Sequence, residues 1–337
     1  MNVSRLFWLF LCNYSLNLIG FAYHPVDFQS PLNVIAFGSC NDVERPQPLW
    51  AVVAENQPDL WIWCGDNIYG DSRKAAVLEK KYRQQFEQPD YAIFRRQFAI
   101  VGTWDDHDYG WNNATGTFSI KAISKTLALD FMEAPETDPR RQHEGIYGAY
   151  DFGPDGQRVK IVLLDNRYFS TDPEAEDPQL LGKIQREWLA ETLEKGTAQI
   201  NILVSGTQII SEEHKYEKWA NFPAERDWLL DCIRKKSVPG VILISGDRHF
   251  HEISILKEAD APYPLVEVTS SGLTHSWENF EGEPNQHRVG EIFTGLGFGM
   301  LRIDWNHRPV MVTAEVRNRS NKVMNSYRIL LGPEPEK

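Results

Sequence analysis

The chain has 337 residues, 42% of them hydrophobic, with 11 Trp and 17 Phe. This composition is typical of a globular protein with a sizeable core and excludes an intrinsically disordered one. The formal net charge of −12 argues against a protein that coats nucleic acid, because such a protein needs a basic face. A phosphorylated substrate is not excluded, since bound di- or trivalent cations reverse the local field.

The amino-terminal stretch has the features of a targeting segment. One positive charge, at Arg5, precedes a mostly apolar run from Leu6 to Ala22. We interpret residues 1–22 as a signal peptide, with an element of the mature domain as the alternative. Polar residues interrupt the run and disfavour a stable membrane span. This interpretation predicts a secreted or periplasmic protein. Since no linker or composition break follows, residues 23–337 should form a single domain.

Removal of the signal would take Cys12 away and leave Cys40, Cys64 and Cys232. An odd number of cysteines in an exported protein means that at least one is outside any intramolecular disulfide. Such a thiol is available for another role.

The predicted elements begin with a short apolar strand at Val34–Phe37, a helix at Pro48–Gln57 and a second strand at Leu60–Cys64. This order predicts a right-handed βαβ unit with two parallel strands. The carboxyl ends of parallel strands meet at one sheet edge, where open α/β sheets place their ligand sites. Cys40 and Asp66 should therefore emerge side by side.

The chain then continues with alternating helical and strand-like segments. We expect helices at Ser72–Gln88, Ser119–Met132, Lys183–Leu193 and Pro223–Lys236. Strands are expected at Ala99–Trp104, Tyr147–Phe152, Val159–Leu164, Ile200–Val204 and Val241–Ile244. A Gly-Pro-Asp-Gly sequence makes the second and third of these strands a hairpin. The inward face of the helix at Ser119–Met132 is assigned to Ile120, Ile123, Leu127 and Phe131.

The carboxyl-terminal part is predicted to be mostly β. Its expected strands are Ile253–Leu256, Leu265–Thr269, Phe298–Asp304, Val310–Val316 and Val323–Leu330. The chain therefore starts as α/β and ends as β, with no internal repeat.

A dense group of charged residues, Asp105–Asp108, follows the strand at Ala99–Trp104. Its three acids would repel one another unless cations neutralise them or the loop is fully solvated. A solvated loop is the ordinary explanation. The large aromatic side chains of Trp104, Tyr109 and Trp111 make it less attractive, because exposed acidic loops rarely carry them.

Four predicted strand ends carry side chains that commonly bind metals: Cys40, Asp66 with Tyr69, Asp106 with His107, and Asp247 with His249. Carboxylates suit hard ions, whereas imidazole and thiolate suit softer ones. Each group alone has an ordinary explanation, such as a buried thiol that acts as a small hydrophobe. Four such ends on one sheet edge instead predict a polynuclear metal centre.

These motifs resemble those of the alkaline phosphatase D (PhoD-type) family of the metallophosphoesterase superfamily. The matching segments are Ser39–Cys40, Gly65–Tyr69, Trp104–His107 and Gly246–His249, and the similarity extends over residues 34–277. The resemblance implies an α/β fold, a four-layer α/β/β/α sandwich of two mixed sheets, and a metallophosphoesterase catalytic domain at 23–337. Relatives often carry a separate β-domain before the catalytic one, and Cys40 lies too close to the predicted signal for that.

The resemblance also implies how the metal ligands are divided. Asp66 would bridge the ions. An Fe(III)-type ion would be held by Cys40, Tyr69 and His249. Harder ions, Ca(II) above all, would be held by Asp106, Asp247 and Asn113, with Asn112 as the alternative to Asn113. Wider relatives have Asn and His where this chain has Asp106 and Asp247, and zinc or manganese are alternative metals.

Two further residues are catalytic candidates by the same resemblance. A metal-bound hydroxide would attack phosphorus, and His107 would protonate the leaving oxygen or hydrogen-bond a phosphate oxygen. Arg167, in a Leu-Asp-Asn-Arg segment similar to the family's Leu-Asp-x-Arg, would hold the phosphate through bidentate donors.

The expected function is that of an exported metal-dependent phosphoesterase, an alkaline phosphatase or phosphodiesterase acting on phosphate monoesters, diesters or both. Because no basic patch is evident, small-molecule or lipid-derived esters are favoured over polynucleotides. The alternative is a non-enzymatic exported calcium-binding protein with a structural metal site. The sequence does not indicate an oligomeric state.

Overall fold

The computed structural model describes residues 26–257 and 263–331, so the predicted signal peptide lies outside the described residues. The strands form two sheets, with orders β13-β12-β11-β1-β2-β3 and β10-β8-β9-β7-β6-β5-β4. The six-stranded sheet consists of β1 (Val34–Gly38), β2 (Leu60–Cys64), β3 (Ala99–Thr103), β11 (Gly297–Asp304), β12 (Val310–Asn318) and β13 (Val323–Leu331). The seven-stranded sheet consists of β4 (Gly148–Phe152), β5 (Val159–Leu163), β6 (Ile200–Ser205), β7 (Val241–Ser245), β8 (His251–Leu256), β9 (Leu265–Ser270) and β10 (Arg288–Phe293).

The two sheets pack face to face because their strands alternate between two apolar faces. In β2, Leu60, Ile62 and Cys64 point into the core between the sheets. The intervening Trp61 and Trp63 point to the other side, into a second core beneath the helices. A strand that is buried on both faces reads as a continuous apolar run, which explains why β2 was predicted with its observed limits.

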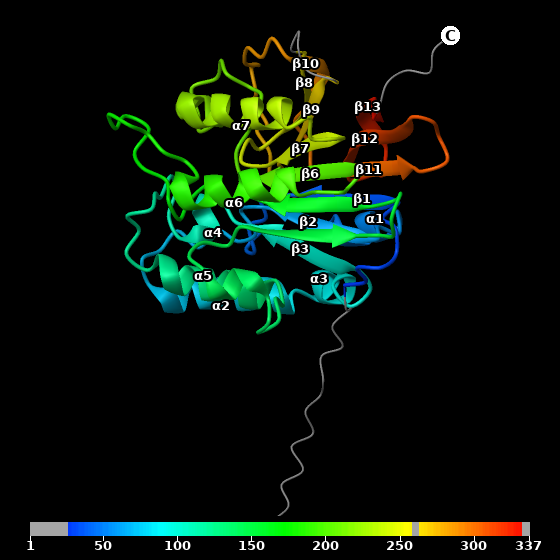
Figure 1. Cartoon of the computed structure of the whole chain (residues 1–337). Helices are drawn as coiled ribbons and strands as arrows, with labels where there is room; N and C mark the ends of the chain where they lie inside the picture. Colours follow the sequence, from blue (N-terminus) through cyan, green and yellow to red (C-terminus); the bar gives the residue numbers. More distant parts are fainter. Residues whose placement is uncertain (1–25, 258–262, 332–337) are drawn as a thin grey trace, which may run out of the picture.

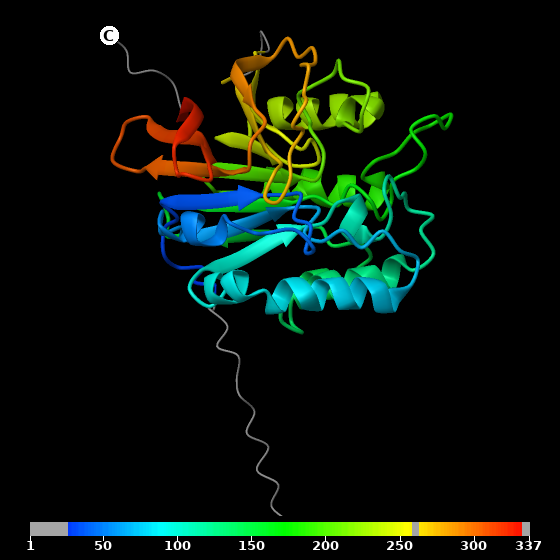
Figure 2. The ribbon, with the colours of Figure 1, turned by 180° about the vertical axis from the view of Figure 1, so that it is seen from behind.

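Helices cover the outer face of each sheet. The helices are α1 (Trp50–Ala54), α2 (Ala75–Glu87), α3 (Pro89–Phe94), α4 (Asp106–Tyr109), α5 (Lys121–Phe131), α6 (Gly182–Glu194) and α7 (Pro223–Lys235). α6 and α7 lie against the seven-stranded sheet, and α2 and α5 lie on the opposite side of the molecule (Figure 1). The view from behind shows α1 beside β1, and α2 beyond β3 at the bottom of the view (Figure 2). The predicted four-layer α/β/β/α sandwich of two mixed sheets is confirmed.

The strand pairings bring the loops of the predicted motifs to one end of the sandwich. β1, β2 and β3 are parallel neighbours, with Gly38 opposite Trp63 and Trp63 opposite Gly102. β5, β6, β7 and β9 are likewise parallel, and β4 and β5 form the predicted hairpin. β11 runs antiparallel to β1 and places the carboxyl-terminal strands at the other side of the first sheet.

The structure corrects several expectations. The ligand-bearing strand ends do not share one sheet edge: β1, β2 and β3 belong to one sheet and β7 to the other. The acidic segment after β3 is not a plain loop, because Asp106–Tyr109 forms one helical turn. α3 and β10 were not predicted. β10 is an edge strand with the sequence Arg-Val-Gly-Glu-Ile-Phe, whose apolar residues do not alternate with polar ones as they do in a typical half-buried strand.

One position on the predicted inner face of α5 was wrong. Ile123 is 47% exposed, and the small residues Ser124 and Ala128 are buried instead. The other three positions are confirmed, because Phe131 is buried and Ile120 and Leu127 pack against the core beneath the helices. Small side chains at i and i+4 permit close packing against a neighbouring helix, and α5 contacts α2. Within the described part of the chain, no helix has the length and apolar character needed to cross a membrane.

Candidate metal centre

The turns that follow the strands are held tightly against one another. Gly65, directly after β2, has φ +94°, and a Cβ at this position would lie 2.6 Å from Cβ of Asp105. A Cβ on Gly206, after β6, would lie 2.5 Å from Oδ1 of the same aspartate. Only glycine fits such close approaches, so these turns bring the loop after β3 between the loops of both sheets.

Four predicted ligands have an unusual backbone conformation. Cys40, Asp66, Asp247 and His249 have φ of 60°, 51°, 69° and 55°. Non-glycine residues in the left-handed region are uncommon and cost of order 1 kcal/mol or more each. Such strain persists only where the surrounding structure enforces it, and it concentrates at functional sites. In this chain it aims donor atoms from separate loops toward one point.

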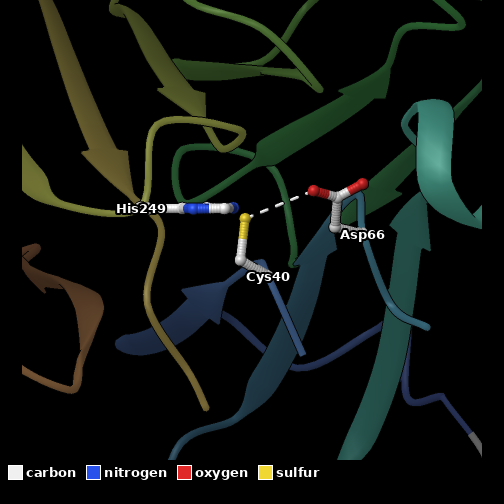
Figure 3. A group of neighbouring side chains, drawn as sticks. All are labelled: Cys40, Asp66 and His249. Carbon is white, nitrogen blue, oxygen red and sulfur yellow. Dashed lines mark hydrogen bonds between the residues drawn. The ribbon is translucent and has the colours of Figure 1, made fainter. Parts of the chain in front are cut away.

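The first donor group combines sulfur, nitrogen and oxygen. Cys40, Asp66 and His249 each place a ligand atom within 4.8 Å of the others, and Figure 3 shows the three side chains converging from three loops. The sulfur of Cys40 lies 3.3 Å from Oδ2 of Asp66. The hydroxyl of Tyr69 lies 3.1 Å from Nε2 of His249 and 3.4 Å from Oδ2 of Asp66. We name Cys40, Tyr69 and His249 the thiol end of the site.

Two further donor groups continue from the first. Asp66, Asp106 and His107 form one, and Asp105, Asp106 and Asp247 form the other, each with ligand atoms within 4.8 Å of one another. We name Asp105, Asp106 and Asp247 the carboxylate end. Because Asp66 and Asp106 each belong to two groups, the three groups are linked into a chain, as a centre with more than one metal ion requires.

The electrostatics of these residues favour bound cations. Burial, together with Cys40, raises the pKa of Asp66 well above its usual range. Burial and Asp106 raise the pKa of Asp247 to about 6, and burial raises the pKa of the Cys40 thiol to about 11. Oδ1 of Asp66 and Oδ2 of Asp105 are buried without a hydrogen-bond partner. Bound metal cations would offset the desolvation cost of these acids and would give the two unpartnered oxygens a ligand contact, so the residues fit a metal centre.

The predicted ligand Asn113 approaches the site through its main chain. Its backbone N–H donates to Oδ2 of Asp106 at 2.5 Å. The residue is exposed, as is Asn112, and both line the cavity beside the site. The structure thus places Asn113 next to a ligand without joining its side-chain oxygen to the three groups, and a ligand role stays a prediction.

His107 lies between the two ends of the site. Its Nδ1 is 2.7 Å from Oδ1 of Asp71, and its ring stacks against Tyr69 with centroids 4.2 Å apart. Burial alone would lower the pKa of His107, but Asp66 and Asp71 outweigh it and raise this pKa to about 10. Cations on Asp66 and Asp106 would oppose that rise. Since Asp71 binds one ring nitrogen, the other is free to meet a ligand in the cavity.

Arg167, the predicted phosphate-binding residue, is buried and engaged with acids. Its Nε donates to Oδ1 of Asp105 at 2.6 Å, and its two terminal nitrogens bind the carboxylate oxygens of Glu217 at 2.9 Å each. Its Nη2 also lies 2.6 Å from Oδ1 of Asp105, so acids engage four of its five N–H donors. Arg167 lines the same cavity of about 840 Å³ as His107, Asp247 and His249.

Sequence reasoning missed three acids that hold the site together. Asp105 was seen as part of the acidic segment but not as a member of a donor group. Asp108 accepts hydrogen bonds from the backbone N–H of Asp66, Asn67 and Asp105. Asp71 orients His107. The Asp105-x-x-Asp108 spacing resembles a helix-capping pair and could have indicated α4, whereas nothing local connects Asp71 to His107.

The three cysteines that the structure describes have different surroundings. Cys40, Cys64 and Cys232 are all free and buried. Cys64 lies in the core between the sheets, facing away from the donor groups. Cys40 is therefore the one thiol, among the described residues, that belongs to a donor group.

Two face-to-face mixed sheets with helices outside, and acidic loops at one end, define the metallophosphoesterase type of fold. Two solved structures share it. PhoD matches with a TM-score of 0.69 at 18% identity, covering 91% of this chain and 74% of that one. A dimetal phosphatase from Danio rerio matches with a TM-score of 0.54 at 12% identity, covering 89% and 99%.

The family follows from sequence comparison. The model of the PhoD-like phosphatases matches residues 35–295, and the chain belongs to this family. It is 25% identical to alkaline phosphatase D of Bacillus subtilis over 274 residues, which are 65% of this chain and 46% of that protein. The chain thus spans about half the length of this curated relative. The predicted family resemblance is confirmed.

Proposed function

We propose that the protein is a metal-dependent phosphoesterase that hydrolyses phosphate monoesters, diesters or both. The observation that carries the proposal is the chain of three linked donor groups beside a cavity large enough for a small-molecule ester. Membership of the PhoD-like phosphatase family supports it. Within this proposal, residues 23–337 form one catalytic domain, and both sheets contribute to its core.

The donor sets support different metals at the two ends. The thiol end offers sulfur, phenol and imidazole, which favour a softer or ferric ion, and the carboxylate end offers only hard oxygens, which favour Ca(II). Fe(III) with Ca(II) is therefore our proposed pair, with zinc or manganese as the alternatives. When bound, such ions lower the pKa of a coordinated water and polarise phosphoryl oxygens.

The side chains of the chain then have separate tasks. Asp66 is shared between both ends, and Asp108 holds its loop in place. His107, oriented by Asp71, can donate a proton to the leaving oxygen or a hydrogen bond to the phosphate. Arg167 balances the charge of Asp105 and has one N–H donor left for a phosphate oxygen. The substrates proposed are small-molecule or lipid-derived esters.

We also propose that the protein acts outside the cytoplasm, as a secreted or periplasmic enzyme. The support is the signal-like sequence at residues 1–22. Cleavage after Ala22 would be seen by mass spectrometry of the protein recovered from its native compartment.

The test of the enzymatic proposal is hydrolysis by the purified protein of a chromogenic phosphate monoester and a diester. Iron with calcium is supplied first, then zinc and manganese. We expect turnover of at least one ester and its loss in Asp66→Asn. If neither ester is hydrolysed with any of these metals, the enzymatic proposal is wrong. Bound calcium without turnover would instead support a structural calcium-binding protein.

A further inference from the structure

The cavity beside the metal centre has a second wall that the proposed reaction does not use. His107, Asp247 and His249 lie on one side of it, and the segment Lys215–Phe222 after β6 lines another part. Its volume of about 840 Å³ is at the upper end of the range for small-molecule sites. The space therefore exceeds what a phosphate group alone would fill.

Lys218, on this second wall, is a buried cation without an acidic partner. It is 7% exposed. Its ammonium donates to the carbonyl oxygen of Tyr216 at 3.2 Å and to Oδ1 of Asn221 at 2.6 Å, both of which are neutral. No ion pair within the described ranges includes Lys218. Since lysines are almost never buried unless paired, an anion is missing from its surroundings.

Arg248 adds a second positive charge to the same place. It is 2% exposed, its guanidinium lies 4.5 Å from the ring centre of Tyr216, and it pairs with Glu283 at 2.6 Å. Its Nε is buried and has no hydrogen-bond partner. Burial and the charge of Arg248 lower the pKa of Lys218. The two cations thus repel each other across Tyr216.

The acidic side chains around the cavity do not neutralise this wall. Glu217 is engaged by both terminal nitrogens of Arg167. Asp172 and Glu174 also line the cavity but are exposed to solvent. Asp247 also lines the cavity beside Arg248, but it belongs to the carboxylate end, where a bound cation would balance its charge. With Asp247 assigned to the metal, Lys218 and Arg248 share one acid, Glu283, and one positive charge is left without an acidic partner.

We infer that Lys218 and Arg248 bind a second anionic group, a carboxylate or phosphate carried by the alcohol portion of the substrate. The inference rests on the proposed function and names a substrate class for the same site. An ester with such a group places its reacting phosphate at the metal ligands and its distal anion at Lys218. Lys218 uses two of its three ammonium N–H donors within the chain, and the third can make a charge-assisted hydrogen bond to the distal anion.

The experiment compares two series of alkyl phosphates of increasing chain length, one ending in a carboxylate and the other in the neutral amide. Release of inorganic phosphate by the metal-loaded enzyme gives kcat and KM. At the chain length that spans the cavity, we expect kcat/KM for the carboxylate to exceed that for the amide by about tenfold or more. The gain should come from a lower KM, with kcat little changed. Lys218→Met should abolish most of this preference and Lys218→Arg should keep part of it.

Lys183→Met is the matched control, because the Lys183 side chain is 79% exposed on α6, and it should leave the preference unchanged. If the wild-type enzyme cleaves both series equally at every length, the anion site is wrong while the phosphoesterase proposal stands. If it cleaves neither these esters nor chromogenic ones, the proposed function itself fails. A preference that survives in a folded Lys218→Met variant would also overturn the assignment.

Discussion

The thiol end and the carboxylate end of the site are built alike but differ in charge. Both lie on turns that follow parallel strands, and both include residues with positive φ. Without metal the thiol and phenol of Cys40 and Tyr69 are neutral, because burial raises the pKa of each. The carboxylate end instead gathers three acids, and Arg167 provides its nearby positive charge.

The same backbone design therefore serves two kinds of site. At the thiol end, binding a metal has to displace protons from the donors. At the carboxylate end the acids differ among themselves. Arg167 keeps the pKa of Asp106 below its usual value against the effect of burial, whereas burial raises the pKa of Asp105 and Asp247. Each end should therefore respond to substitution in its own way, whereas residues shared by both ends should affect both metals.

The largest effect is expected for Asp66→Asn, because Asp66 groups with Cys40 and His249 on one side and with Asp106 and His107 on the other, and so links the two ends. Asparagine tolerates the left-handed backbone and keeps the shape, so the fold should survive. Activity should fall by about a thousandfold or more, since metal stabilisation of the transition state is worth several kcal/mol. Metal analysis should show both ions depleted. Asp155→Asn, in an exposed turn, is the control, and retention of either ion at full occupancy would contradict a bridging role.

Separate substitutions at the two ends should separate the metals. Cys40→Ser should weaken binding at the thiol end by at least about a hundredfold, and Asp106→Asn should do the same at the carboxylate end. Elemental analysis and the visible spectrum distinguish the two, because thiolate or phenolate bound to Fe(III) absorbs visible light. Cys64→Ala should cost about 1 kcal/mol of stability and leave both metals. Equal loss of both ions in both variants would remove the distinction between the ends.

Between the two ends, His107→Gln should reduce kcat by about a hundredfold or more while both metals stay bound. The reason is that His107 is proposed to act on the leaving oxygen and lies beside Asp106, a proposed ligand. His107 also belongs to one donor group, so metal analysis of this variant is decisive. Loss of a metal would make His107 a ligand, and an unchanged kcat would remove it from the reaction.

The sequence was sufficient for the parts of the fold that are set locally. β2 was predicted with its observed limits, because its apolar run is followed directly by Gly65, whose positive φ forms the turn. The ligand candidates were found in the same way, as polar residues that directly follow apolar strands. α4 and β10 were not predicted, because a four-residue helix and an edge strand without alternating apolar residues carry little periodicity.

Features that depend on distant contacts could not be predicted. The assignment of β3 and β7 to different sheets is decided by packing across the core, not by either strand's own residues. The burial of Lys218 could not be predicted, because in the sequence a lysine among polar residues is indistinguishable from one on the surface. Asp71 likewise acquires its role only where its loop meets His107, 36 residues further along.

The smallest effect is expected for Asp71→Asn, which tests whether His107 depends on its orientation. The amide keeps the shape but loses the charge that fixes the ring 2.7 Å away, so kcat should fall by about tenfold with KM and both metals unchanged. The matched control is Asp151→Asn, since Asp151 is comparably exposed and also pairs with one cation. In the His107→Gln background, Asp71→Asn should add almost nothing, because both residues act through one imidazole. Additive losses would mean that Asp71 contacts the substrate or a metal by itself.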